Sequence, residues 1–208
     1  LSAEGQISGW LTITSTGSYA IWKARYFHGL DRDSAVYRLN KTIQPFFAGA
    51  QVVDYKVPKI ADGKTPDEVK VKAFFTCPAN QPNSENQLPL AFPKSSALFN
   101  DYGNNKNRET DYYQWLETLS VNASIATSDA WSPASLPTPF TAHTPHYEVS
   151  ASWKYSPASQ KIEASLTLRT LKNLIPSKQV ATAQQADRAL SAWLKSPILL
   201  KKGAGAAD

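Results

Sequence analysis

Few side chains of this chain have the chemistry of a nucleophile or a metal ligand, because its 208 residues include one cysteine and three histidines. The cysteine, Cys77, follows an apolar stretch and directly precedes a proline. A nucleophilic cysteine needs a nearby base and a cationic setting that lowers its thiol pKa. No histidine lies near Cys77 in the sequence. The pattern therefore predicts a structural cysteine.

Two of the histidines, His143 and His146, are three residues apart. Pro145 lies between them and excludes a helix that would place both imidazoles on one face. A metal site would also need further ligands at a recurrent spacing. We therefore interpret this segment as a solvated loop that contains proline. We expect the third histidine, His28, at the C-terminal end of a helix, where the helix dipole favours a cation.

Other motifs of catalysis and binding are missing or badly placed. The sequence contains no G-x-S-x-G elbow, phosphate-binding loop or dinucleotide fingerprint. The acceptor pattern for N-glycosylation begins at Asn40 and at Asn122, but we expect the first in a helix and the second in a strand. We therefore name no catalytic, cofactor-binding or metal-ligating residue, and we expect no cofactor.

The composition is that of a globular chain with a core. It is 42% hydrophobic and 11% aromatic, richer in both than disordered chains are. The formal net charge of +5 is spread along the chain without a basic stripe, so we expect no nucleic-acid partner. No apolar run approaches the length of about 20 residues that crosses a bilayer, so we expect no membrane span. A single cysteine leaves the compartment open.

The first fifty residues read as a strand followed by two helices. Residues 10–14 are apolar and β-branched, which favours an extended strand. Ser18 is placed as the N-cap of a first helix and Gly29 as its C-terminal glycine. This helix is apolar on all sides, so we expect it to be buried between layers. A second helix should begin after an N-cap at Asp33 and stop or kink near Pro45.

Beyond Gly49 the hydrophobic period alternates, as it does in strands. Residues 50–60 and 69–75 should form an antiparallel pair about a turn at Asp62-Gly63, with one face in water. Residues 112–126 are also extended in character. Residues 132–145 contain several prolines, and we expect no regular element there.

The final segments predict a hairpin, a helix and a short strand. Residues 146–157 and 161–171 alternate cleanly and are separated by a short polar turn, which is typical of a hairpin. Residues 176–195 have a helical apolar stripe, with Ser177 as a possible cap. A terminal strand over 196–202 follows.

These patterns predict an α+β fold with mainly antiparallel, sandwich-like β-structure, two N-terminal helices and one C-terminal helix. We expect one accessory domain over residues 1–202, either undivided or with two subdomains meeting near 100–110. A flexible tail should occupy residues 203–208. The chain starts at Leu1 and contains no Met, so we expect it to be a fragment or a processed product of a longer protein.

The order of these elements resembles a bacterial module. The first half contributes Gly17, a helix with Ala20, Ala24 and Arg25, a second helix, and the strands VVDYKV and VKVKAFF. The second half contributes RETDYYQWLETLSV, LPTPFTAHTPHYEVSASWKY, IEASLTLRTL and ILLKK. In this order they are similar to the C-terminal domain of unknown function of bacterial multi-domain proteins with a transglutaminase-like domain. The resemblance covers nearly the whole chain and rests on pattern and order.

The resemblance implies a non-catalytic accessory or packing module of a larger exported protein, periplasmic or extracellular. Its partners would be the upstream domains of the same polypeptide or another envelope protein. The Cys-His-Asp site of such proteins lies in the transglutaminase-like domain, so no catalytic residue is carried over. The isolated chain is accordingly expected not to be an enzyme.

Two other classes of function are consistent with the sequence. A carbohydrate-binding module would use exposed aromatic side chains, for which the candidates are Trp10, Trp115, Trp131 and Trp153. An uncharacterised hydrolase would need a serine or Cys77 brought next to a histidine in the fold, and the candidates for that base are His28, His143 and His146.

Overall fold

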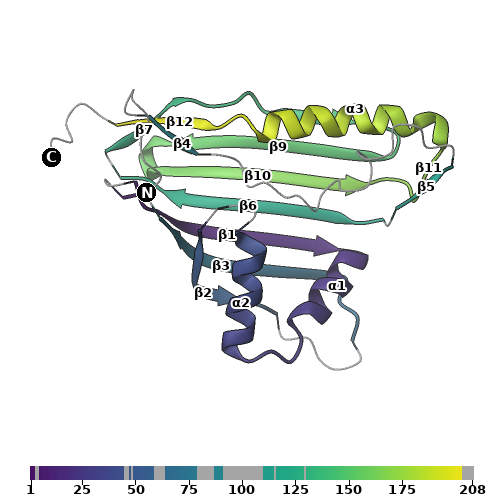
Figure 1. Ribbon diagram of the computed structural model, residues 1–208, viewed down its shortest axis with the longest axis horizontal. Helices are drawn as coiled ribbons and strands as arrows, with labels where there is room; N and C mark the ends of the chain where they lie inside the picture. Colours follow the sequence, from purple (N-terminus) through teal and green to yellow (C-terminus); the bar gives the residue numbers. More distant parts are fainter. Residues whose placement is uncertain are drawn as a thin grey trace.

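The computed structural model describes residues 1–2, 5–44, 47, 49–58, 64–78, 87–90, 110–114, 116–128 and 130–202. Within these residues, three α-helices and a large antiparallel sheet form an α+β fold (Figure 1). Two helices follow the first strand and the third lies near the C-terminus, as predicted. The turn expected at Asp62-Gly63, residues 100–109 of the expected junction, and the tail over 203–208 lie outside the described residues.

The large sheet has seven strands in the order β2-β3-β1-β6-β10-β9-β8, and all neighbours are antiparallel. The strands are β1 (Ile7–Thr16), β2 (Gln51–Lys56), β3 (Glu68–Cys77), β6 (Thr118–Ala126), β8 (Phe140–His143), β9 (Tyr147–Ser156) and β10 (Lys161–Thr170). The predicted β2–β3 pair and β9–β10 hairpin are both confirmed. A short 3-10 turn, η1 (Pro157–Ser159), connects β9 to β10.

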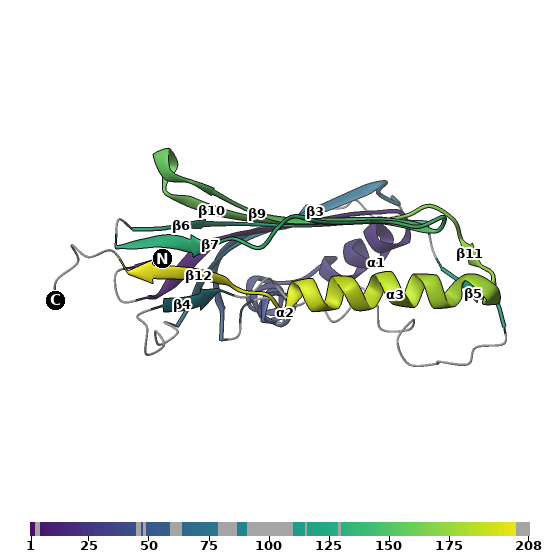
Figure 2. The same ribbon diagram turned by 90° about the horizontal axis from the view of Figure 1, so that it is seen from above.

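One face of this sheet is apolar and covered. In β1 every second residue is buried, and the same alternation holds in β3, β6, β9 and β10. The helices and a smaller sheet lie on this side, and no described element covers the other face (Figure 2). The smaller sheet joins β4 (Gln87–Leu90), β12 (Ile198–Lys202) and β7 (Trp131–Ser135) in the order β4-β12-β7. Its Leu88, Ile198 and Leu200 are fully buried in the same core.

The first helix, α1 (Ser18–Phe27), packs against β1 and β3. Its Ala20, Ala24 and Phe27 form a second apolar cluster together with α2 (Arg32–Ile43) and β3. The expectation that α1 is buried between layers is wrong, because the side chain of Trp22 is 54% exposed. The helix covers one face of the sheet and its outer side faces solvent, so its apolar composition does not reflect burial on all sides.

Gly29 follows the end of α1 with φ of 65°, as predicted for its C-terminal glycine, but the N-caps of the helices differ from those predicted. Gly17, with φ of 63°, is the N-cap of α1, and Ser18 is the first helical residue. A Cβ at residue 17 would lie 2.4 Å from the carbonyl oxygen of Leu116, so only glycine fits here. Asp31, not Asp33, caps α2, because its carboxylate accepts a 2.7 Å hydrogen bond from the backbone N–H of Ser34. Pro45 lies outside the described residues.

The proline-bearing segment 132–145 is more regular than expected. It contributes most of β7 and all of β8, so the prediction of no regular element is wrong. Both strands lie at the edge of their sheets, where a residue without a backbone donor is tolerated. The chain between them is held to α3 (Ser177–Leu194), since the indole Nε1 of Trp193 donates a 2.6 Å hydrogen bond to the carbonyl of Thr138. A further pair, β5 (Tyr112–Tyr113) and β11 (Leu174–Ile175), lies near the start of α3.

A truncation in the small sheet tests this core. The side chain of Trp131 is 2% exposed, and its Nε1 donates a 3.0 Å hydrogen bond to the carbonyl of Ser2. Trp131→Ala should lower the free energy of unfolding by about 3–5 kcal/mol, since it leaves a cavity. Lys201→Ala, at an exposed position of the adjacent strand, should stay within about 0.5 kcal/mol of the parent. Urea denaturation measures both, and equal small effects would contradict the packing of this sheet on the core.

Candidate functional site

The open face of the large sheet is a lattice of polar side chains. The register places Lys72, Thr12, Asn122, Ser165 and Ser152 in one row across five neighbouring strands. Each belongs to a strand whose alternate residues are buried in the core, so the row must project from the opposite face.

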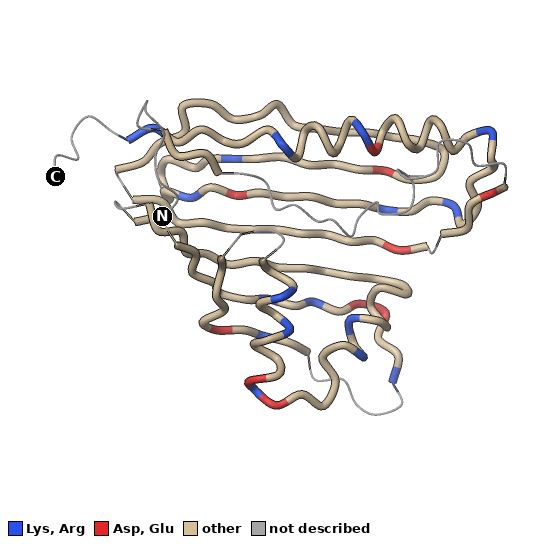
Figure 3. The backbone as a smooth tube through the Cα atoms, in the orientation of Figure 1, with Lys and Arg blue, Asp and Glu red and all other residues tan. Residues whose placement is uncertain are grey.

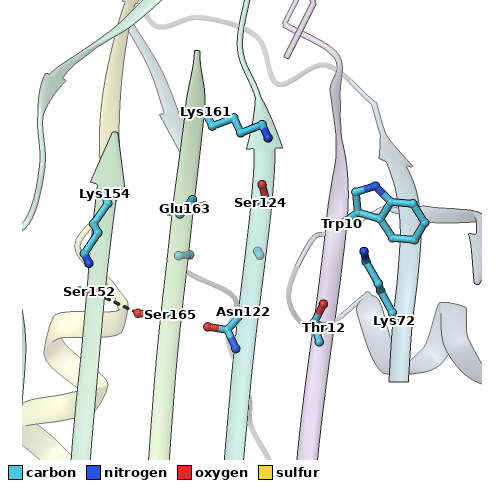
Figure 4. Close-up of a pocket in the computed structure, with 12 residues that line it drawn as sticks. Trp10, Thr12, Lys72, Asn122, Ser124, Ser152, Lys154, Lys161, Glu163 and Ser165 are labelled. Carbon is cyan, nitrogen blue, oxygen red and sulfur yellow. Dashed lines mark hydrogen bonds between the residues drawn. The ribbon is translucent and has the colours of Figure 1, made fainter. Parts of the chain in front are cut away.

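The next row along the strands is more varied. It consists of Phe74, Trp10, Ser124, Glu163 and Lys154. The two rows and Lys161 surround a hollow of about 510 Å³, which we call the polar hollow (Figure 4). Phe74 flanks it beside Trp10, and the other side chains line it. The site is thus a depression on an open sheet face, built from five strands.

Trp10 provides the aromatic surface of the polar hollow. Its indole lies 5.3 Å from the ring of Phe74 at an interplanar angle of 55°. The ammonium of Lys72 lies 4.3 Å from the centroid of the Trp10 ring, which is a cation–π contact. These neighbours come from β3, directly beside β1 in the sheet, and they restrict the orientation of the indole.

The charges of the hollow are mainly positive. Lys72, Lys154 and Lys161 line it together with a single acid, Glu163. Across the described residues none of these four side chains forms an ion pair, so the ammonium groups are available to a ligand. Lys161 extends toward the strand that carries Ser124 (Figure 4).

The short polar groups of the hollow can both donate and accept hydrogen bonds. The hydroxyls of Ser152 and Ser165 lie 2.9 Å apart on β9 and β10. Thr12, Asn122 and Ser124 add hydroxyl and amide groups from β1 and β6. None of the lining residues is a histidine or a cysteine, so the hollow holds no nucleophile paired with an imidazole base. Its chemistry is that of polar recognition.

The structure separates Cys77 from the candidate bases. Cys77 ends β3 and is buried, and burial raises the pKa of its thiol. Three strands, β1, β6 and β10, lie between β3 and β9. Cys77 pairs with Ile7 at one end of the sheet, whereas His143 pairs with Glu148 at the other. No Cys–His pair is assembled from these residues.

The three histidines have different environments. His143 is exposed on β8, and its Nδ1 lies 3.2 Å from Oε1 of Glu148. His146 is buried, with its Nε2 hydrogen-bonded to the side chain of Gln179. The expectation of a solvated loop is therefore wrong for His146, because α3 packs over this turn. His28 lies at the C-terminal end of α1, as predicted.

Of the three candidate tryptophans that the structure describes, one lies at the surface of the sheet. Trp131 and Trp153 are core residues, 2% and 3% exposed, and cannot meet a ligand at the surface. Trp115 lies outside the described residues. Trp10 remains, on the open face. The alternation of polar and apolar residues in β1 and β6 signals such a face, but the order of strands that makes one hollow of it is not visible in the sequence.

Two carboxyl groups outside the hollow have pKa values above their ordinary range. Burial raises the pKa of Glu117 to about 7, although a 3.0 Å hydrogen bond from the Ser18 hydroxyl opposes the shift. Burial raises the pKa of Asp187 on α3 to about 6, and the neighbouring Arg188 opposes that shift. Within the described structure, Oδ1 of Asp187 is buried without a hydrogen-bond partner.

The described part of the chain holds neither clustered metal ligands nor a helix that could span a membrane. It holds no group of three or more His, Cys, Asp or Glu side chains that could ligate an ion. None of its helices combines the length and the apolar character that a bilayer span requires.

No family model, curated protein or solved structure matches this chain. The polar hollow is therefore interpreted from its own side chains.

The two carboxyls predict how stability depends on pH. In the unfolded chain the pKa values of Asp187 and Glu117 are near 3.8 and 4.5, whereas in the folded protein they are about 6 and about 7. Between the unfolded and folded pKa values, the folded state therefore binds more protons than the unfolded state. Their contribution to stability is complete below about pH 4 and is lost as the pH rises to about 7. Asp187→Asn should therefore stabilise the protein, relative to the parent at the same pH, more at pH 8 than at pH 4. Thermal melts across this range measure it, and an effect independent of pH would contradict the assignment.

Proposed function

We propose that the chain is a non-catalytic binding module whose polar hollow takes a carbohydrate. The observation that carries the proposal is the hollow itself, in which hydroxyl, amide and ammonium groups surround one partly exposed indole. Apolar ligands favour hollows lined mainly by hydrophobic side chains, whereas most of the residues that line this hollow are polar. A saccharide offers hydroxyls that both donate and accept, together with apolar C–H faces.

The hydrogen-bonding groups of the hollow suit such a ligand. Thr12, Ser124 and Asn122 come from β1 and β6, and their spacing is fixed by the sheet rather than by a loop. A rigid sheet presents them with little conformational entropy left to lose on binding. Trp10 would supply an aromatic surface for a sugar ring on the side not occupied by Lys72.

The charges of the hollow favour an acidic saccharide. Three lysines outnumber the single Glu163, so a carboxylate or sulfate on the ligand would gain favourable contacts. Lys154 and Lys161 lie on β9 and β10, at the opposite side of the hollow from Lys72. A ligand that reached both sides would span the width of five strands.

The place of the module in a longer protein follows from the resemblance described above. We propose that it accompanies a transglutaminase-like domain in an exported bacterial protein of the periplasm or the extracellular space. Upstream domains of the same polypeptide, or another envelope protein, would be its partners. A surface of this kind would hold a polysaccharide near such a domain, and the full-length gene product would test the context directly.

Binding of saccharides tests the hollow. Isothermal titration with neutral oligosaccharides and with oligosaccharides of uronic acids should show binding of the acidic set. Trp10→Ala should weaken it by about 0.5–1.5 kcal/mol, or about two- to tenfold in Kd, because an aromatic contact is lost. Lys154→Gln should weaken binding of the acidic set more than that of any neutral sugar.

Lys70→Gln is the matched control for the charge. Lys70 lies on the same face of β3 as Lys72 but outside the hollow, so this variant should bind like the parent. Binding of no saccharide by the parent chain, or equal affinity of the Trp10→Ala variant and the parent, would overturn the proposal.

A hydrolase that uses Cys77 is the competing function. The raised thiol pKa and the separation of Cys77 from His143 and His146, which lie at the other end of the sheet, argue against it. Cys77→Ser should leave any activity in a screen of esters and peptides unchanged, and it should cost about 1–3 kcal/mol of stability from burying a hydroxyl. Turnover that disappears with Cys77→Ser would instead establish an enzyme.

A further inference from the structure

The outer side of α1 and α2 carries aromatic rings beside cations, some of them exposed and the others partly buried. We call this surface the aromatic–cationic patch, and it consists of Trp22, Lys23, Tyr26, Tyr37, Arg38 and Lys41. Its two outermost rings, Trp22 and Tyr37, are 54% and 59% exposed, one on each helix. Single exposed apolar side chains are common on protein surfaces, but here two of them belong to one surface that also carries cations.

The rings and cations of the patch contact one another in pairs. Trp22 stacks on Tyr26 with ring centroids 5.0 Å apart and an interplanar angle of 15°. The guanidinium of Arg38 lies 4.7 Å from the centroid of Tyr26, and it also donates a hydrogen bond to the backbone carbonyl of that residue. Arg38 thereby ties the second helix to the first, so the patch is one surface across both.

The remaining cations lie over the outer rings. The ammonium of Lys41 is 4.7 Å from the centroid of Tyr37, and that of Lys23 is 5.3 Å from the centroid of Trp22. Figure 3 shows basic positions along both helices. Arg25 and Arg32 add to them, whereas the carboxylates Asp31 and Asp33 lie together at the start of α2. The surface therefore favours an anionic partner.

The arrangement of the rings indicates which anionic partner fits. Single-stranded nucleic acid would stack its bases on free aromatic faces. In the patch each ring already has a ring or a cation over one face, which leaves at most the other face of each ring for a base. Binding to a bilayer surface does not require that another ring stack on these aromatic faces. Trp and Tyr rest with their apolar rings at the level of the headgroups, and neighbouring Lys and Arg extend toward lipid phosphates.

We propose that the aromatic–cationic patch docks the protein onto the surface of an anionic lipid bilayer. Trp22 and Tyr37 enter the headgroup layer, while Lys41 and its neighbours bind anionic headgroups. The helices α1 and α2 lie on one face of the large sheet (Figure 2), whereas the residues of the polar hollow belong to the other face, so the hollow stays open to solution when the patch is docked. This surface is independent of the proposed carbohydrate site.

Sedimentation with vesicles tests the docking. The purified chain is mixed with vesicles of phosphatidylcholine alone, or of phosphatidylcholine with one-third phosphatidylglycerol. We expect binding to the second kind only, and a blue shift of tryptophan emission that Trp22→Phe diminishes. Lys41→Glu should weaken binding by roughly fivefold or more, because each basic residue near an anionic surface contributes about 1 kcal/mol. Trp22→Ala should weaken it as well.

The controls match these variants in residue type and exposure. Tyr113→Ala removes a ring that is 74% exposed on β5, and Lys201→Glu reverses an exposed lysine on β12, so both variants should bind vesicles like the parent. Trp10→Ala should also bind vesicles like the parent, which separates this surface from the polar hollow. Circular dichroism confirms that each variant is folded.

Three outcomes would overturn the docking. The first is no binding to either kind of vesicle, and the second is equal binding to both kinds. The third is binding of a single-stranded oligonucleotide that Trp22→Ala and Lys41→Glu abolish while vesicles are ignored, which would assign the patch to nucleic acid.

Discussion

Side chains alternate between the two faces along the five inner strands of the large sheet, so each of these strands presents one row to the core and one to water. On the core side, apolar residues of neighbouring strands lie directly opposite one another. Leu11 and Ile13 of β1 face the core beside Val71 and Ala73 of β3 and Val121 and Ala123 of β6. Burial of this face is what stabilises the sheet, because hydrophobic transfer is the main favourable term in folding. The positions of the helices follow from it.

The covered face is closed by pieces from both ends of the chain. The helices α1 and α2 cover β1, β2 and β3, while α3 and the small sheet complete the other half of the core. Val52 and Tyr55 of β2 contact both apolar clusters and connect them. Because the helices lie on one side only, each has an outer surface, and on α1 and α2 that surface is the aromatic–cationic patch.

The open face is free of the packing constraint, and its composition shows this. Short hydroxyl and amide side chains occupy positions that β-propensity alone would fill with larger residues. They leave room for a hollow, and the lysines at its sides stay without acidic partners in the described structure. Elsewhere the fold buries ionisable groups, since the carboxyls of Asp187 and Glu117 lie in surroundings that disfavour their charged form. The polar hollow is different, because its polar groups lie on the open face of the sheet.

Much of the secondary structure is determined by local sequence. The alternation of 146–157 and 161–171 gives a hairpin, and the spacing of Val180, Leu190 and Leu194 gives a helix, since both depend on near neighbours. Predictions failed where a distant segment intervenes. Asp111 accepts a hydrogen bond from the backbone N–H of Ser177 at the start of α3, and Glu117 accepts one from Ser18. No local pattern contains such partners.

The candidate site shows the same division. Sequence alone places Lys72 on the wet face of its strand, because its neighbours in the chain alternate with apolar residues, and it names Trp10 only as one of four candidate exposed tryptophans. Only the tertiary structure decides that β6 and β10 lie next to β1, which brings Ser124, Asn122 and Glu163 beside them. It also decides that Trp131 and Trp153 are core residues. Strand order depends on which apolar rows pack together between segments that are far apart in the chain. No single segment contains that information.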